Sequence, residues 1–411
     1  MRAFPSRSFP PSRCLHSLLL AIAAVTLSIA PAAAQSDSIL CDTPRELRCE
    51  PMELDAFVAR CEAQLDGRHE ATLAHGTPRQ LAGATLGWLR LGRADRALAT
   101  LEALAQRAAE GDHDANAWWL IARFWMSRAM SLPSEAIDET RRVVDAARSL
   151  ATECARTDNP PSLTRHVLCV HAIACASELL SEKHDAKARD ELIAAARRSL
   201  LRFEEIHWSE PHAAFVDHTL RPSADGLLAC AIGMLAATGN RAERNARSCL
   251  ASLPADCASQ VALAARAQFG FEVDATLAQL LANAPHADDD ETGWTLDAAM
   301  FAITGLRLAT GPRVDAAWLR LRPVLPQGFD RMRIRGLALD GWRCELEFAR
   351  TRGDASAIGR YTLTPIESRA TWRQLVVHHG AETFVAPALA GVEVELPPRS
   401  KERELSSPST R

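Results

Sequence analysis

The sequence predicts a mainly helical fold, made of about six stacked helical hairpins followed by a small antiparallel β-sandwich. Two patterns carry this prediction. Between residues 51 and 310, apolar side chains recur every three or four positions, and proline or glycine repeatedly interrupts the pattern. After Gly311-Pro312 the apolar side chains alternate instead, which is typical of half-buried strands. The chain has 411 residues, 47% hydrophobic and 24% charged, which is enough for two or three folded domains.

The first 34 residues have the composition of an export signal. Three arginines and no acidic residue precede an apolar run from Leu18 to Ala30. The small residues Pro31–Ala34 follow, and we expect cleavage before Gln35. The apolar run is shorter than the ~20 residues that a membrane span needs. The sequence therefore predicts an exported protein, periplasmic or extracellular, with no membrane span.

Removal of this signal takes Cys14 with it and leaves ten cysteines. An even number of cysteines in an oxidising compartment favours disulfides. Cys249 and Cys257 flank a turn and are candidates for a local bridge. The sequence contains no C-x-x-C or H-x-x-x-H spacing, so we expect no metal site and no other cofactor.

The helical region divides into hairpins joined by short loops. The candidate helices span residues 51–65, 78–91, 94–109, 114–130, 134–154, 162–181, 185–206, 224–238, 241–251, 256–268, 274–283 and 293–309. Asp112 or Asp114 is suited to cap the fourth helix, and Ser162 is suited to cap the sixth. Stacked hairpins either coil open as a solenoid or close into a ring, and periodicity alone does not decide between them.

One hairpin favours the open arrangement. Leu86–Leu104 is close to the turn between the two helices of a tetratricopeptide repeat. The other hairpins do not repeat its key positions at the period of about 34 residues that such repeats require. An open helical-repeat scaffold that holds a protein partner in its concave face is therefore the alternative function.

Short strands are expected from about residue 318 onward. Residues 342–348 alternate apolar and charged side chains, and Asp340-Gly341 before them favours a hairpin turn. Gly336 shifts the preceding alternation by one residue, which predicts a β-bulge. Further candidate strands span residues 318–324, 358–364, 373–378, 382–386 and 391–396. We therefore expect a helical domain over residues 35–310, a β-sandwich domain over 311–397 and a disordered tail over 398–411.

Four stretches of the sequence resemble a known family: Glu110–Ala122, Leu200–Asp217, Gly293–Gly305 and Leu321–Phe329. The first two resemble helix segments of glucoamylase-like enzymes. The last two resemble the last helix and the sandwich entry of the disaccharide phosphorylases and the rhamnosidase-like families. Together they resemble the six-hairpin glycosidases, whose helices form an (α/α)6 toroid. The resemblance implies a closed ring with its active site where the inner helices begin.

The sequence departs from this family in two respects. The expected ring is shorter than a typical catalytic toroid, which leaves little room for long active-site loops. Where the phosphorylases carry Glu-Gly and a His before the last inner helix, this chain has Gly293, Trp294 and Leu296. The resemblance therefore implies either an inverting glycoside hydrolase or a degenerate relative that binds sugar without cleaving it.

Inverting cleavage of a glycoside uses two carboxyl groups about 6.5–9.5 Å apart. The acids at the expected starts of inner helices are the candidates: Asp114, Asp225 and Glu291 as catalytic groups, and Asp112 as a substrate-binding group. One acid would protonate the leaving oxygen and another would activate water. The competing interpretation is helix capping for the three aspartates and a solvated loop for Glu291.

Sugars also bind by stacking on aromatic rings. Trp118, Trp119, Trp208 and Trp294 lie near the same expected helix starts, and His166 opens the sixth helix. We expect these five residues to bind substrate. The competing interpretation is core packing for the tryptophans and a helix-end role for the histidine.

The expected partner is an oligo- or polysaccharide. The formal net charge is −4, which argues against nucleic acid because phosphate binding needs a basic surface. The sequence contains no G-x-S-x-G, P-loop or G-x-G-x-x-G motif, so it gives no sign of serine hydrolase or nucleotide chemistry.

Overall fold

A computed structural model of the chain describes its central part. The described residues are 47–129, 137–156, 158, 160–180, 185–218, 220–231, 240–253, 259–282, 291–305, 318–321, 325, 329–339, 342–351, 354–368, 374–379, 382–387 and 392–395. All of them belong to one unit, Asp42–Arg411. The expected export signal and C-terminal tail lie outside the described residues, so both stay predictions.

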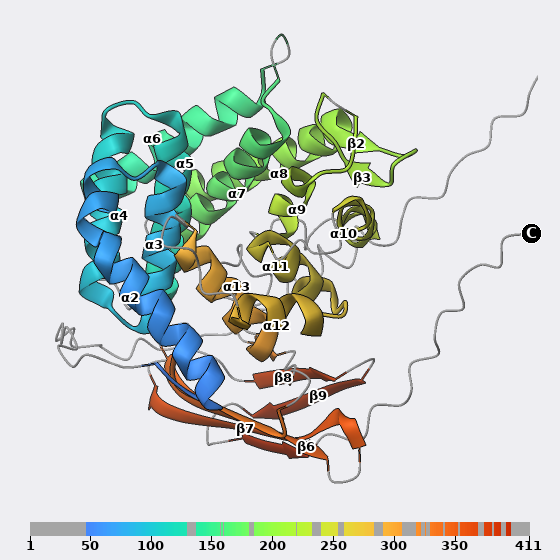
Figure 1. Cartoon of the computed structure of the whole chain (residues 1–411). Helices are drawn as coiled ribbons and strands as arrows, with labels where there is room; N and C mark the ends of the chain where they lie inside the picture. The colour runs from blue at the N-terminus through green and yellow to red at the C-terminus, as the bar shows by residue number, and fades with distance from the viewer. Residues whose placement is uncertain are drawn as a thin grey trace, which may run out of the picture. The chain divides into compact units, whose positions relative to one another are not determined.

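The described helices form two layers, which alternate along the chain (Figure 1). The inner helices are α3 (Pro78–Leu91), α5 (His113–Ala129), α7 (Leu163–Leu179), α9 (Ala224–Ala231), α11 (Gln260–Phe269) and α13 (Thr292–Thr304). The outer helices are α2 (Met52–His75), α4 (Ala94–Ala109), α6 (Ile137–Cys154), α8 (Ala186–His207), α10 (Asn240–Ser252) and α12 (Asp274–Ala282). This alternation is the stacked-hairpin pattern that the sequence predicts.

The inner helices form a closed ring. Each packs against the next in the order α3, α5, α7, α9, α11 and α13, and α13 packs back against α3. Every residue from Leu81 to Leu91 of α3 and from Thr292 to Thr304 of α13 is buried, as expected for helices enclosed on all sides. The predicted toroid is therefore confirmed, and the open solenoid is excluded for this part of the chain.

Glycines allow the first and last inner helices to approach closely. Gly83 and Gly87 lie about one turn apart on α3, and Gly293 of α13 lies against both. A Cβ atom on Gly293 would lie 1.9 Å from the carbonyl oxygen of Gly83, and one on Gly87 would lie 2.9 Å from Cα of Gly293. The ring therefore closes at a point where side chains do not fit. Beside it, the indole of Trp294 donates to the carbonyl oxygen of Arg79 at 3.3 Å.

A buried ion pair joins the same two helices. The guanidinium of Arg90 donates to Oδ1 of Asp297 at 2.7 Å from both Nε and Nη2. The Arg90 side chain is 0% exposed and that of Asp297 is 2% exposed. Since either charge alone would be costly in this position, the pair specifies which faces of α3 and α13 meet.

Most observed helix ends lie within a few residues of the predicted ones. Helix α13, however, ends at Thr304 before the left-handed Gly305 rather than at residue 309, and the predicted continuation of α9 over residues 232–238 lies outside the described residues. Helix α2 continues to His75, past the predicted end at residue 65. Residues 66–75 are mostly polar, so they lack the apolar periodicity on which the prediction relied. They nevertheless include alanine, arginine, glutamate and leucine, which are good helix formers. The helix ends only before the capping box of Thr77 and Gln80, which begins α3.

The strands form two larger sheets and one short hairpin. They are β1 (Arg48–Glu50), β2 (Trp208–Ser209), β3 (Ala214–Phe215), β4 (Trp318–Leu321), β5 (Arg331–Leu339), β6 (Trp342–Thr351), β7 (Asp354–Ser368), β8 (Gln374–His379), β9 (Glu382–Pro387) and β10 (Val392–Glu395). The sheet β1-β5-β6-β7-β10 is antiparallel throughout. In the sheet β4-β8-β9, however, β4 runs parallel to β8, which corrects the all-antiparallel expectation.

The hairpin of β5 and β6 confirms two details of the sequence analysis. Leu339 pairs with Trp342, so the connection has the two-residue length that the predicted turn requires. The register shifts at Gly336, whose φ is 80°, as the predicted bulge requires. Strand β1 was not predicted, because three residues are too few to show an alternating pattern.

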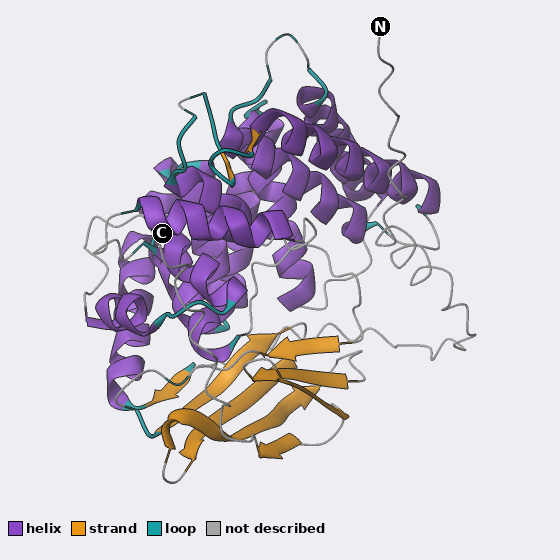
Figure 2. Cartoon of the chain, turned by 90° about the vertical axis from the view of Figure 1, so that its right-hand side faces the viewer, coloured by secondary structure: helices purple, strands orange, loops and turns teal. Residues whose placement is uncertain are grey.

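The larger sheet lies against one end of the ring. Its buried side chains include Met332 and Ile334 on β5 and Phe348 on β6. Strand β5 packs against α3 and α5. Arg90, in the last turn of α3, lies close enough to Cys344 on β6 for its charge to oppose the effect of burial on the pKa of that thiol. Figure 2 shows the strands of the two larger sheets gathered at one end of the helices. The end at which α3 begins therefore faces away from this sheet.

The cysteines whose side chains the structure describes are buried, and none forms a disulfide with another described cysteine: Cys49, Cys61, Cys154, Cys169, Cys175, Cys249 and Cys344. Cys257 lies outside the described residues, so the local bridge to Cys249 is not seen. Within the described part of the chain, no helix is long and apolar enough to cross a membrane. The same residues contain no cluster of three or more potential metal ligands.

Candidate functional site

The starts of the inner helices form the candidate site. We call this set of helix starts the rim; it comprises residues 77–80, 112–116, 162–165, 223–226, 259–262 and 291–293. Each outer helix returns the chain to the same level, so the inner helices run in the same direction. Helix starts present unpaired N–H groups and the positive end of the helix dipole. The rim is therefore a place where acidic side chains are stabilised.

Asp112 caps α5. Its Oδ1 accepts the backbone N–H of Asp114 at 2.8 Å and that of Ala115 at 3.0 Å. The side chain is exposed, and these two hydrogen bonds account for its position.

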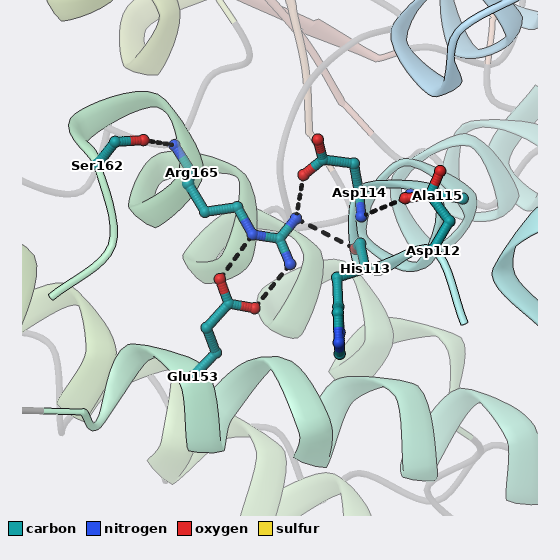
Figure 3. A network of polar contacts seen from close by, with 7 residues as sticks. All are labelled: Asp112, His113, Asp114, Ala115, Glu153, Ser162 and Arg165. Atoms are coloured by element: carbon teal, nitrogen blue, oxygen red, sulfur yellow. Dashed lines mark hydrogen bonds and ion pairs between the residues drawn. The ribbon is translucent and has the colours of Figure 1, made fainter. Parts of the chain in front are cut away.

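Arg165, at the start of α7, joins three helices at the rim (Figure 3). Its Nε and Nη2 each donate to one oxygen of Glu153 at 2.7 Å, and Nη1 donates to Oδ1 of Asp114 at 2.5 Å. Nη1 also donates to the backbone carbonyl of His113 at 3.1 Å. The Arg165 side chain is 14% and that of Glu153 20% exposed, whereas that of Asp114 is 62% exposed. This fork therefore ties the starts of α5 and α7 to the end of α6, with its contact to Glu153 largely buried and its contact to Asp114 at the surface.

Glu153 and Arg165 were missed by the sequence analysis. The hydrogen bond from Arg165 holds the pKa of the Glu153 carboxyl below its ordinary value, although burial acts in the other direction. A signal for Glu153 existed, because it lies in the last turn of α6, where the helix dipole disfavours an acid. An acid in this unfavourable position indicates that a cation lies close enough to stabilise its negative charge.

The three predicted catalytic acids lie at different helix starts. Asp114 belongs to the fork on α5, α6 and α7, whereas Glu291 pairs with Arg79 of α3 at 2.7 Å. Asp225 lies exposed in the first turn of α9. The contacts of Asp114 and Glu291 thus place an arginine from a neighbouring helix beside each of the two carboxylates.

Two of the predicted sugar-binding tryptophans pack inside the ring, below the rim. Trp294 of α13 contacts Trp118 and Trp125 of α5 edge to face, with ring centroids 5.4 and 5.5 Å apart. Trp118 is 3% and Trp294 9% exposed. Both residues therefore have the core-packing role that was the alternative interpretation.

The other two tryptophans lie against arginines. Trp119 is buried, and the guanidinium carbon of Arg142 lies 4.5 Å from its ring centroid. Trp208, at the end of α8, is half-buried, and the guanidinium carbons of Arg241 and Arg244 lie 5.2 and 5.3 Å from its ring. Among the four predicted sugar-stacking tryptophans, Trp208 is therefore the one that is not buried. Two guanidinium groups already lie against its ring, however.

His166 forms a buried pair with a second histidine. Its Nδ1 lies 3.3 Å from Nε2 of His207, whose Nδ1 lies 3.2 Å from the carbonyl oxygen of Val216. Burial, together with His166, lowers the pKa of His207 to about 4. His166 is 0% exposed, so it lies beneath the rim rather than on it.

Two thiols adjoin this histidine pair. Interaction with Cys169 and with His166 lowers the pKa of the Cys154 thiol on α6, against the effect of burial. Cys154 is 1% and Cys169 0% exposed, so the cluster lies within the core.

A cavity of about 230 Å³ lies beside the rim, between α2, α3 and α13. The residues that line it are Gln64, Leu65, Arg68, His69, Ala71, Thr72, His75, Gly76, Gln80, Ala84, Trp88, Thr292 and Gly293. None of the predicted site residues is among them. Most of its α2 lining lies beyond residue 65, in the part of the helix that the sequence analysis did not predict.

Comparison with known proteins gives a likeness of fold. The chain matches no family model and no curated protein by sequence. A solved structure of a GH78 family rhamnosidase of Bacillus sp. GL1 is similar, with 11% identity and a TM-score of 0.48. The match covers 75% of this chain and 40% of the rhamnosidase chain. The conclusion that the ring is closed depends on the contacts between the inner helices of this chain.

Proposed function

We propose that this protein binds carbohydrate at the rim without cleaving it, as a degenerate relative of the six-hairpin glycosidases. Two features support carbohydrate as the ligand class. The sequence resembles that family over four separate stretches, and the described helices close into the ring that the resemblance implies. Arg79, Arg165 and the acids of the rim are hydrogen-bonding groups of the kind that sugar hydroxyls pair with.

The Arg165 fork is the observation that argues against cleavage. Glycoside hydrolysis needs one carboxyl group that carries a proton to the leaving oxygen. Asp114 faces a guanidinium at 2.5 Å, and an arginine has only donors, so the carboxylate is an acceptor in this arrangement. Glu291 has the same kind of partner in Arg79. Two carboxylates held in this way are suited to binding rather than to proton transfer.

The alternative of an open scaffold for a protein partner loses its structural basis. That function depends on the concave face of an unclosed superhelix. Here α13 packs against α3 through Gly293, so the corresponding face is closed by the ring. We further propose that the chain acts after export, in the periplasm or outside the cell, since residues 1–34 have the pattern of a cleaved signal.

The test combines binding and hydrolysis on the same ligands. The full chain would be titrated calorimetrically with a panel of neutral oligosaccharides, and each mixture would be assayed for new reducing ends. We expect saturable binding of at least one oligosaccharide, weakened in Asp114→Asn, with no new reducing ends. Hydrolysis that Asp114→Asn or Glu291→Gln abolishes would establish an enzyme instead. Failure to bind any member of the panel would overturn the carbohydrate proposal.

A further inference from the structure

Arg68 is the one permanently charged side chain among the residues that line the cavity between α2, α3 and α13. Arg68, His69 and His75 of α2 line it, and its lining contains neither aspartate nor glutamate. The first turns of α3 and α13 also border it, through Gln80 and Thr292. Helix starts add positive potential at this end of the cavity. The cavity is therefore electrostatically suited to an anion.

Two of its lining residues leave a buried ring nitrogen without a hydrogen-bond partner among the described residues. These atoms are Nδ1 of His69 and Nε1 of Trp88, whose side chains are 4% and 2% exposed. The two rings contact each other edge to face at 5.7 Å. A buried polar atom without a partner costs free energy, so a bound molecule with hydrogen-bonding groups would be favoured here.

The remaining lining suits a small hydroxylated molecule. Gln64, Gln80 and Thr292 offer amide and hydroxyl groups, and the indole of Trp88 with Ala84 offers an apolar surface. Thr292 donates to Oε1 of Gln64 at 3.1 Å, so these two polar groups lie side by side in the lining. A volume of about 230 Å³ is below the ~300 Å³ at which sites for drug-sized ligands begin, and is appropriate for a monosaccharide.

We propose that this cavity binds a monosaccharide that carries an anionic group, either a sugar carboxylate or a sugar phosphate. Arg68 contacts the anionic group, and the amides, the hydroxyl and the indole contact the sugar ring. This site shares Gln80, Thr292 and Gly293 with the rim, but it goes beyond the function proposed there, because its lining includes neither Asp114 nor Arg165. The two proposals can therefore fail independently.

Calorimetric titration of the full chain with glucuronate, glucose 6-phosphate, inorganic phosphate and glucose tests the proposal. We expect one or both sugar anions to bind at least tenfold more tightly than glucose. Tighter binding of glucuronate would identify a sugar carboxylate as the ligand class, and tighter binding of glucose 6-phosphate would identify a sugar phosphate. Equal binding of inorganic phosphate and glucose 6-phosphate would overturn the role of the sugar ring.

Two variants locate the binding in this cavity. Arg68→Gln should weaken the sugar anion at least tenfold, whereas Arg148→Gln, which removes a cation from a surface ion pair on α6, should not. Ala71→Trp places a large ring at the cavity from an exposed position of α2, so the helix should fold while binding is lost. Unchanged affinity in Ala71→Trp, or no binding of either sugar anion to the unmodified chain, would overturn the proposal.

Discussion

At the residue scale, arginines decide what the acids of the rim can do. The chain has only three lysines, at positions 183, 187 and 401, so nearly every cation is a planar guanidinium. A guanidinium can serve two carboxylates at once, because its five N–H groups lie in one fixed plane. Arg165 does this with Glu153 and Asp114. The result is a set of charges whose geometry is fixed by these hydrogen bonds, which is the basis of the proposal that the rim binds carbohydrate without cleaving it.

Arg165→Met should lower the free energy of unfolding by about 2 kcal/mol, since charge-assisted hydrogen bonds of low exposure contribute roughly this amount. The loss arises because Glu153, which is 20% exposed, would keep its charge at the end of α6 without a donor. Urea denaturation measures the change. The matched control is Arg148→Gln, where the partners are 56% and 46% exposed and we expect no measurable effect. Equal effects in both variants would contradict the structural role of the fork.

His207 should make stability depend on pH. In the unfolded chain it binds a proton near its ordinary pKa of 6.5, whereas in the folded protein burial and His166 lower the pKa to about 4. Between these two values the unfolded state binds more protons, so stability falls as the pH decreases from 7 toward 4. After allowance for screening, the loss between pH 7 and pH 5 should be about 1 kcal/mol.

Urea denaturation of the parent chain and of His207→Gln at both pH values checks this dependence. The variant removes the titrating group, so its stability should change less between pH 7 and pH 5. His166 and Asp217 also act on His207, so both should be left in place. An identical pH dependence in the two proteins would show that His207 is not the source.

Contacts between individual side chains are the part of the structure that the sequence predicts least well. Helix capping by Asp112 was one of two interpretations available from its position, and its two hydrogen bonds agree with it. The partners of Arg165 lie 12 and 51 residues away along the chain. A single sequence contains no information about which of the many acids lies beside a given arginine, so the fork could not be predicted.

At the scale of elements, periodicity was a reliable guide wherever a helix buries an apolar face. All twelve predicted helices have counterparts among the described residues, with ends that differ by a few positions in most cases. The exception, α2, shows the physical reason for failure. Its second half faces a polar cavity rather than the core, so it has no apolar stripe to detect.

The crossing of α3 and α13 gives a prediction at this scale. Gly293→Ala would place a Cβ atom 1.9 Å from the carbonyl oxygen of Gly83, and backbone atoms cannot move aside as a flexible side chain can. We expect a loss of about 3 kcal/mol or more, because overpacking forces the two helices apart. Thermal or urea unfolding of the variant measures the loss.

Gly67→Ala is the matched control. Gly67 lies inside α2, and an added Cβ would meet nothing within 4 Å. The same substitution should therefore stabilise the protein there by about 0.5–1 kcal/mol, because alanine favours the helix. Opposite signs for the two substitutions are the expected result, and a loss of similar size in both would show that the crossing is not tight.

At the scale of the whole molecule, the ring depends on contacts between segments about 200 residues apart. The resemblance to six-hairpin glycosidases predicted that the ring closes, but the residues that close it were not predicted as such. Gly293 was noted only as a departure from the family pattern, and Arg90 and Asp297 were not singled out. Local periodicity contains no information about contacts between residues so far apart along the chain. The residues that close the ring are therefore identified only by the structure.

The buried pair of Arg90 and Asp297 tests how much the closure depends on charge. Asp297→Asn should cost about 3–5 kcal/mol, because it leaves the Arg90 guanidinium buried without a counter-charge. The double variant Arg90→Met/Asp297→Leu removes both charges and replaces them with apolar groups of similar size, so it should be more stable than Asp297→Asn. Chemical denaturation of the three proteins measures this order. If the double variant is instead the least stable of the three, the attraction between Arg90 and Asp297 contributes more to the contact of α13 with α3 than apolar packing can replace.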